Sequence, residues 1–145
     1  LYIGPEQAEY IGAAHEEMLE KVFSEIPDID RDHCFIGGFS NGAHAVAVQL
    51  IHESTGPRLR SRFKYFIFVE GGHRIRPVPI LEGSHFLLLQ GGKKKPWLQP
   101  FAEALEKAPG VSAELRTMPE TGHAFPPAEK EFVRAWILRK CGLEE

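Results

Sequence analysis

A serine flanked by glycines is the first group in this sequence that could do covalent chemistry. Residues 38–42 read Gly-Phe-Ser-Asn-Gly, which places Ser40 in a G-x-S-x-G pattern. The pattern is typical of a sharp strand-to-helix turn, on which the serine is strained and exposed while Gly38 and Gly42 let the neighbouring backbone pass closely. Serine is a weak nucleophile at neutral pH, so a base must lie nearby. Alternatively, Ser40 is only the N-cap of a helix, a position that serine favours.

His123 is the histidine best placed to act as that base. It lies in the loop Gly122-His123-Ala124-Phe125, after the last predicted strand and before the last predicted helix. A histidine there could take the serine proton and return it to a leaving group. His73 is the one rival, because its loop also follows a strand. For the other histidines packing or solvated roles are expected: His15, His33, His44, His52 and His85.

The elements that must position these residues alternate along the chain. Short apolar runs predict strands at 34–36, 63–69 and 86–89, and a fourth strand is predicted at 111–118. Helices are predicted from Pro5 to about Ile26 and over 41–52, 98–107 and 128–140. This alternation predicts one α/β domain over residues 1–145, a three-layer αβα fold with a mostly parallel sheet of about four strands. Ligands of such folds bind beyond the carboxyl ends of the strands.

Glycines and prolines predict where these elements end. The pairs Gly37-Gly38, Gly71-Gly72 and Gly91-Gly92 are expected to stop the first three strands, and Thr55-Gly56-Pro57 the second helix. Residues 74–84, which contain two prolines, are expected to form a surface crossover loop that could also cover a site. The first helix is expected to carry an apolar face at helical spacing: Ile11, Ala14, Met18, Val22 and Ile26.

Composition narrows the classes of partner. The 145 residues are 43% hydrophobic and carry a formal net charge of −3, so neither nucleic acid nor an anionic membrane is an expected partner. No apolar run reaches the roughly 18 residues of a membrane span, and no signal peptide is visible, although one could lie upstream; the compartment stays open. Cys34 and Cys141 give no disulfide framework. The motifs H-E-x-x-H, C-x-x-C and G-x-G-x-x-G do not occur, so no metal or cofactor is predicted.

The strand, the pentapeptide at 38–42, the helix, the two further strands and the Gly-His loop together resemble the α/β-hydrolase fold. Asp30-Arg31 and Ser40-Asn41-Gly42 are similar to esterases of the polyhydroxybutyrate depolymerase and feruloyl esterase group, with dienelactone-hydrolase relatives close by. The resemblance covers nearly the whole chain but only the half of the fold after its early strands, which are expected to be missing. It implies a serine hydrolase of small-molecule carboxylic esters, with an acyl-enzyme on Ser40 and His123 as general base.

The resemblance also implies a catalytic acid, which in the fold usually follows the third strand seen here. That place holds Lys93, Lys94 and Lys95. We expect these lysines to form a solvated loop, although they could attract a carboxylate-bearing substrate. The acid must therefore come from another part of the chain.

Glu70 is the best candidate for that acid. No aspartate occurs after Asp32, so an acid between the serine and the histidine must be a glutamate, and Glu70 directly follows a strand. Some lipases of this fold keep their acid there. A solvated loop carboxylate is the other interpretation of Glu70. The remaining glutamates are less well placed: Glu82, Glu103 and Glu120.

The implied oxyanion hole and the missing strands lead to two further expectations. One oxyanion donor would be the backbone N–H of Asn41, and the other would come from an early loop that the chain lacks. Without the early strands, the strand before Ser40 has an unpaired edge, through which a homodimer could form.

Two hypotheses of another class remain open. In the first, the chain is a catalytically silent hydrolase-like domain that binds a ligand or a protein partner, since lysines stand in the usual place of the acid. In the second, it is a doubly wound binding domain unrelated to hydrolases, which requires Ser40 and His123 to lie far apart.

Overall fold

Four parallel strands form the centre of the fold. The structure is a computed structural model that describes residues 5–73, 75–93 and 95–143. The strands lie in the order β1-β2-β3-β4. Their bounds are β1 Phe35–Phe39, β2 Tyr65–Val69, β3 His85–Gly91 and β4 Ser112–Met118. Because every pairing is parallel, all four carboxyl ends meet at one edge of the sheet.

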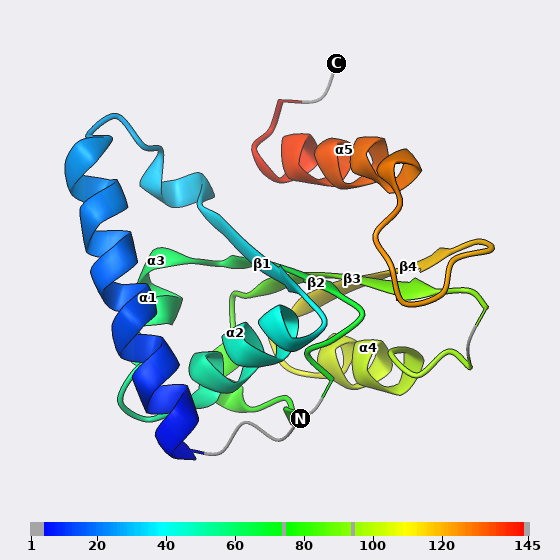
Figure 1. Cartoon of the computed structure of the whole chain (residues 1–145), viewed down its shortest axis with the longest axis horizontal. Coiled ribbons are helices and arrows are strands. Elements are labelled where there is room, and N and C mark those ends of the chain that lie inside the picture. Colours follow the sequence, from blue (N-terminus) through cyan, green and yellow to red (C-terminus); the bar gives the residue numbers. More distant parts are fainter. Residues whose placement is uncertain (1–4, 74, 94, 144–145) are drawn as a thin grey trace.

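Helices cover both faces of this sheet (Figure 1). One face carries α1 Pro5–Glu25, α2 Asn41–Ile51, α3 Gly56–Arg62 and α4 Gln99–Glu106, and the other carries α5 Lys130–Lys140. Single 3-10 turns precede β1, β3 and α5 at Arg31–His33, Pro79–Leu81 and Pro127–Glu129. The predicted three-layer α/β class with a mostly parallel four-stranded sheet is confirmed.

Successive residues of β2 and β3 enter two different cores. Phe66 and Phe86 pack with α2 and α4, while Leu87 and Leu89 pack against Trp136 of α5. All five side chains are almost completely buried. A strand buried on both faces has no polar side, which is why these strands read as continuous apolar runs rather than alternating ones.

The glycines of the first strand do not stop it, contrary to the prediction. β1 continues through Gly37 and Gly38 to Phe39. A Cβ on Gly37 would lie 2.6 Å from the carbonyl oxygen of Ile67 on β2. Glycine is therefore needed inside the strand because another backbone approaches closely. Gly91 likewise belongs to β3.

Two more boundaries differ from expectation. The residues Gly56 and Pro57, expected to end a helix, instead begin α3, because proline is well suited to a first helical turn. Residues 75–84 do not lie wholly on the surface, since Leu81 is 0% exposed and Ile75 is 5% exposed. Their side chains contribute to the core beneath α4. Arg74 and Lys94 lie outside the described residues.

The predicted apolar face of α1 is also wrong in part. Met18, Val22 and Ile26 are exposed, whereas Leu19 is buried and Gly12 faces Thr55 so closely that a Cβ would lie 2.3 Å from its Cγ2. The packed face of α1 therefore contains Gly12 and Leu19, and the apolar spacing alone did not identify it.

The described helices and edges bear on two further expectations. Among residues 5–73, 75–93 and 95–143, no helix has both the length and the apolar character that crossing a bilayer requires. β1 lies at the edge of the sheet. A homodimer through that edge, and early strands missing from the fold, both stay predictions.

We expect His85 to make the stability of the fold depend on pH. Burial, and then the charges of Lys140 and Lys64, lower the pKa of His85 below its ordinary 6.5. Because the unfolded chain binds this proton more readily, the stability that neutral His85 contributes is present above pH 6.5 and is lost as the pH falls through the lowered value. We expect urea unfolding at pH 7.5 and pH 5 to show a larger loss for wild type than for His85→Gln. Equal losses would contradict this.

Candidate active site

Ser40 forms the turn between β1 and α2. Its backbone has φ 54° and ψ −115°, and its N–H donates to the carbonyl of Val69 at 2.8 Å. A non-glycine residue in such a sparsely populated region of φ and ψ costs about 1–3 kcal/mol. The side chain of Ser40 makes no capping hydrogen bond to α2, so the N-cap role does not account for the serine. Strain of this kind is found preferentially at functional sites.

Backbone segments approach each other closely around this turn. Of the two glycines expected to allow this approach, Gly38 does so and Gly42 does not. A Cβ on Gly38 would lie 2.3 Å from the carbonyl carbon of Gly42. A Cβ on Gly42 would meet nothing within 4 Å among the described residues, so the steric need expected there is not observed. The second close approach occurs at Gly71 instead, since a Cβ on it would lie 2.4 Å from the carbonyl oxygen of Ser40.

The structure brings His123 to the serine. Nε2 of His123 lies 2.9 Å from Oγ of Ser40, although the two residues are 83 positions apart. Two backbone hydrogen bonds hold the loop that carries His123: Gly92 N–H to Met118 at 2.8 Å and Lys93 N–H to Thr121 at 3.0 Å. The unrelated binding domain, which needs a large separation, is therefore excluded.

Glu70 completes a hydrogen-bonded series with these two residues. Its Oε2 lies 3.1 Å from Nδ1 of His123, and its Oε1 accepts the N–H of Gly91. The residue is 1% exposed, so it is not a solvated loop carboxylate. A carboxylate can only accept here, which puts the proton of His123 on Nδ1 and leaves Nε2 free to accept from Ser40.

Backbone geometry sets Glu70 apart as well. Its φ is 53°, and its N–H donates to the carbonyl of Leu89 at 2.9 Å. A Cβ on Gly91 would lie 2.2 Å from the carbonyl oxygen of Gly122. Gly71, which follows β2, and Gly91, which ends β3, thus let the loops that carry Ser40, Glu70 and His123 approach one another. Only glycine fits both places without moving the backbone.

The other candidate residues lie elsewhere. The rings of His73 and Trp97 pack edge to face with centroids 4.3 Å apart, and His73 is not the histidine that meets Ser40. Glu103 accepts from Gln99, and the exposed Glu120 lies 3.9 Å from Nζ of Lys93. Glu82 lies against Gly110, at the opposite end of β3 from the serine.

Asn41 is the first residue of α2. The amide at this position has no partner within its own helix, and it lies at the positive end of the helix dipole. Such an amide can donate to an anionic oxygen beside Ser40. No second donor is assigned among the described residues.

Sequence reasoning missed three residues around this site. Gly71 and Gly91 belong to the Gly-Gly pairs, and their place at the carboxyl ends of neighbouring strands was a usable signal. His44 was expected only to pack or to be solvated, yet its Nδ1 accepts the N–H of Gly72 at 3.2 Å. No spacing in the sequence pointed to that contact.

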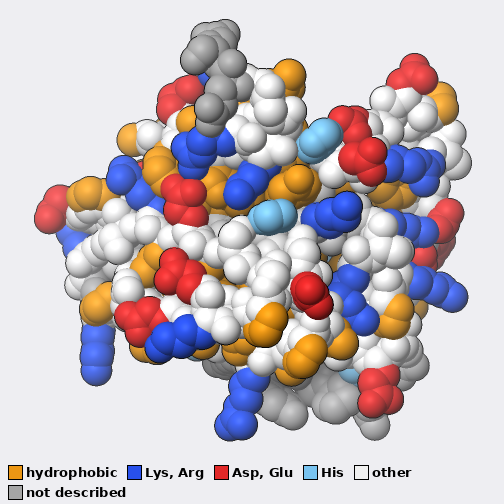
Figure 2. All heavy atoms as spheres, turned by 180° about the vertical axis from the view of Figure 1, so that it is seen from behind, with side chains coloured by type: hydrophobic (Ala, Val, Ile, Leu, Met, Phe, Trp, Pro, Cys, Tyr) orange, Lys and Arg blue, Asp and Glu red, His pale blue; other side chains and the backbone are white. Residues whose placement is uncertain are grey.

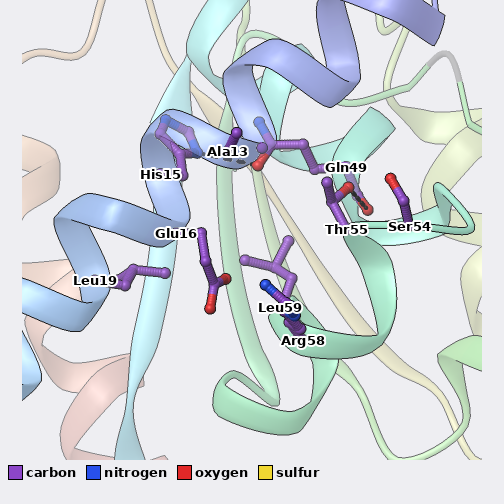
Figure 3. A pocket seen from close by; sticks show the side chains of 10 residues that line it. Ala13, His15, Glu16, Leu19, Gln49, Ser54, Thr55, Arg58 and Leu59 are labelled. Carbon is purple, nitrogen blue, oxygen red and sulfur yellow. Dashed lines mark hydrogen bonds between the residues drawn. The ribbon is translucent and has the colours of Figure 1, made fainter.

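The described residues away from Ser40 form a cavity but no cluster of metal ligands. Among the described residues no three histidine, cysteine, aspartate or glutamate side chains could share a metal ion. A cavity of about 240 Å³ lies between α1, α2 and α3, and its lining includes His15, Gln49 and Arg58 but none of the Ser40 series (Figure 3). Acidic and basic side chains are interspersed on the face shown in Figure 2.

Comparisons with known proteins agree with this architecture. No protein-family model and no curated protein sequence matches the chain. Among solved structures, a Bacillus cereus carboxylesterase is similar at 18% identity and a TM-score of 0.69, over 97% of this chain and 66% of that one. A Mesorhizobium loti carboxylesterase is similar at 19% identity and a TM-score of 0.64, over 92% and 62%. YahD, solved with malic acid, is similar at 17% identity and a TM-score of 0.68, over 93% and 62%.

These likenesses concern the fold. This chain spans 62–66% of the length of those three proteins. The finer resemblance to polyhydroxybutyrate depolymerases, feruloyl esterases and dienelactone hydrolases stays a prediction. The parallel sheet, its flanking helices and these structural neighbours show that the chain has the α/β-hydrolase fold, as it occurs in carboxylesterases.

Proposed function

We propose that this protein is a serine hydrolase of carboxylic esters. The proposal rests above all on one series of contacts: Ser40 Oγ lies 2.9 Å from His123 Nε2, and His123 Nδ1 lies 3.1 Å from Glu70 Oε2. A nucleophile bonded to a base that a third group orients is the geometry needed for acyl transfer. Three loops that are distant in the sequence converge to form it.

The chemistry follows from the roles that these atoms can take. Oγ of Ser40 attacks the ester carbonyl carbon while its proton passes to Nε2 of His123. The N–H of Asn41 stabilises the resulting oxyanion. The C–O bond to the alcohol then breaks, and His123 returns the proton to the alcohol as it leaves. The side chain of Glu70 accepts from Nδ1 of His123 and stabilises the imidazolium. Water repeats the sequence on the acyl-enzyme and releases the acid.

The proposed substrate class is supported by the solved structures with a similar fold. Two of the similar solved structures are described as carboxylesterases. A small-molecule ester also suits a chain whose net charge is only −3. No cofactor enters these steps. The silent binding domain is the competing proposal, and it differs in predicting no acyl-enzyme.

Labelling with a fluorophosphonate tests the proposal directly. The probe should modify wild type at Ser40, as located by peptide mapping, because His123 activates that hydroxyl. His123→Ala should slow labelling by at least about 10²-fold, the usual contribution of a general base. His52→Ala is the matched control and should label at nearly the wild-type rate, because His52 contacts Ser54 at the end of α2 that lies away from Ser40.

The assay should use folded protein that includes any upstream residues its reading frame encodes. Absence of labelling would favour the silent binding domain. Labelling of Ser40 that does not depend on His123 would remove the base from the proposal.

A further inference from the structure

We propose that His44 is a positioning residue for the catalytic acid. Its imidazole ties the backbone that follows Glu70 to the helix that follows Ser40. The inference rests on the proposed function, and it assigns a role to a buried histidine that takes no part in the chemical steps described above.

His44 connects two of the three loops of the site. It lies on the first turn of α2 and is 9% exposed. Its N–H donates to the carbonyl of Ser40 at 3.1 Å, and its Nδ1 accepts the N–H of Gly72 at 3.2 Å. A backbone N–H can only donate, so Nδ1 of His44 must be unprotonated in this contact. The ring is therefore neutral, with its proton on Nε2.

The segment that His44 holds needs an external contact to keep its shape. Glu70 has φ 53° and Gly72 has φ 88°, so two of three successive residues are left-handed. A glutamate does not favour this conformation, and glycine has many alternatives to it. Strained segments persist only where the surroundings over-determine them. The bond from Gly72 to His44 fixes the segment just after the acid.

Ring packing keeps His44 itself in place. Its centroid lies 5.0 Å from that of His73 at 62°, and His73 packs on Trp97 at 87°. Trp97 immediately precedes Leu98, whose N–H donates to the buried Gln90 at 2.9 Å. The imidazole of His44 thus has a fixed orientation, and its Nδ1 has a fixed distance to Gly72.

Losing this bond should move Glu70 rather than abolish its charge. The carboxylate must meet Nδ1 of His123 and the N–H of Gly91 at once, which leaves little freedom for its backbone. A displacement of about 1 Å at a catalytic group can cost 10²-fold in rate. Turnover should therefore fall while substrate affinity changes little.

Three substitutions at His44 separate this role from mere packing. In His44→Asn, Oδ1 occupies the same place along the side chain as Nδ1 and can accept from Gly72. In His44→Gln the amide oxygen is one bond farther out, and His44→Leu has no acceptor. With p-nitrophenyl acetate, we expect Leu and Gln to lower kcat by about 10- to 100-fold with KM within about threefold of wild type. Asn should restore most of that turnover.

The same substitutions in a Glu70→Gln background provide the second readout. If His44 acts through the acid, His44→Leu should lower kcat there by less than about threefold, since residues acting as one unit are not additive. Thermal melting shows whether each variant folds. If His44→Leu does not fold, the comparison of His44→Asn with His44→Gln tests the proposal by itself.

Three results would overturn the positioning role: full kcat in His44→Leu and His44→Gln, equal losses in His44→Asn and His44→Gln, or an undiminished loss in the Glu70→Gln background. Failure of the proposed function is a different result: wild type itself would then show no turnover and no labelling of Ser40, or turnover would survive Ser40→Ala, whatever residue stands at position 44.

Discussion

Ser40→Ala is expected to lower kcat for a simple ester by about 10⁶-fold, the scale seen when the nucleophile of a serine protease is removed. Alanine lacks the oxygen that would form the acyl-enzyme, and the imidazole of His123 loses its partner at 2.9 Å. Alanine also keeps the positive φ of the turn at the same backbone cost, so the comparison isolates the hydroxyl. Hydrolysis of p-nitrophenyl acetate measures the loss.

A second substitution at Ser40 distinguishes the effect of backbone strain on stability from the effect of the lost hydroxyl on turnover. Ser40→Gly should be as inactive as Ser40→Ala but more stable than it by about 1 kcal/mol, because glycine adopts a positive φ without the steric cost. Ser61→Ala is the matched control, since that exposed hydroxyl donates to the carbonyl of Arg58 within its own helix. Turnover within tenfold of wild type in Ser40→Ala would reject the proposed mechanism.

The central strands were predictable because β2 and β3 are largely buried and read as apolar runs. What the sequence could not supply was the role of small residues. Gly37 looked like a strand end but lies inside β1, where it lets the Ile67 carbonyl approach. Gly12 likewise lies close to Thr55 on the packed face of α1, where Leu19 is buried, while Met18 is exposed. Steric fit between distant segments is invisible in hydropathy.

The candidate site, too, was predictable from the sequence only in part. Ser40, His123 and Glu70 could be selected because each follows a predicted strand, and the carboxyl ends of parallel strands share one edge. Glu70 emerged partly by elimination, and its burial could not be predicted from a loop position. The contact between His44 and Gly72 depends on two positive φ angles, which no local pattern specifies.

Glu70→Gln is expected to lower kcat by about 10⁴-fold, comparable with the loss in a serine protease whose acid becomes an amide. The N–H of Gly91 explains why so small a change should matter. It needs an acceptor, so the new amide must turn its oxygen toward Gly91 and its NH₂ toward Nδ1 of His123. Nδ1 must then accept, which moves the ring proton to Nε2. A protonated Nε2 cannot take the proton of Ser40.

Glu120→Gln is the matched control for this prediction. Glu120 has a similar φ of 52° but an exposed side chain whose partner is Lys93. Its kcat should stay within about twofold of wild type, and KM should be unchanged in both variants, because neither carboxylate is expected to contact the ester. A Glu70→Gln protein that melts like wild type but keeps more than a tenth of its kcat would place the acid elsewhere. The strained, fully buried carboxylate beside His123 would then be left without a function.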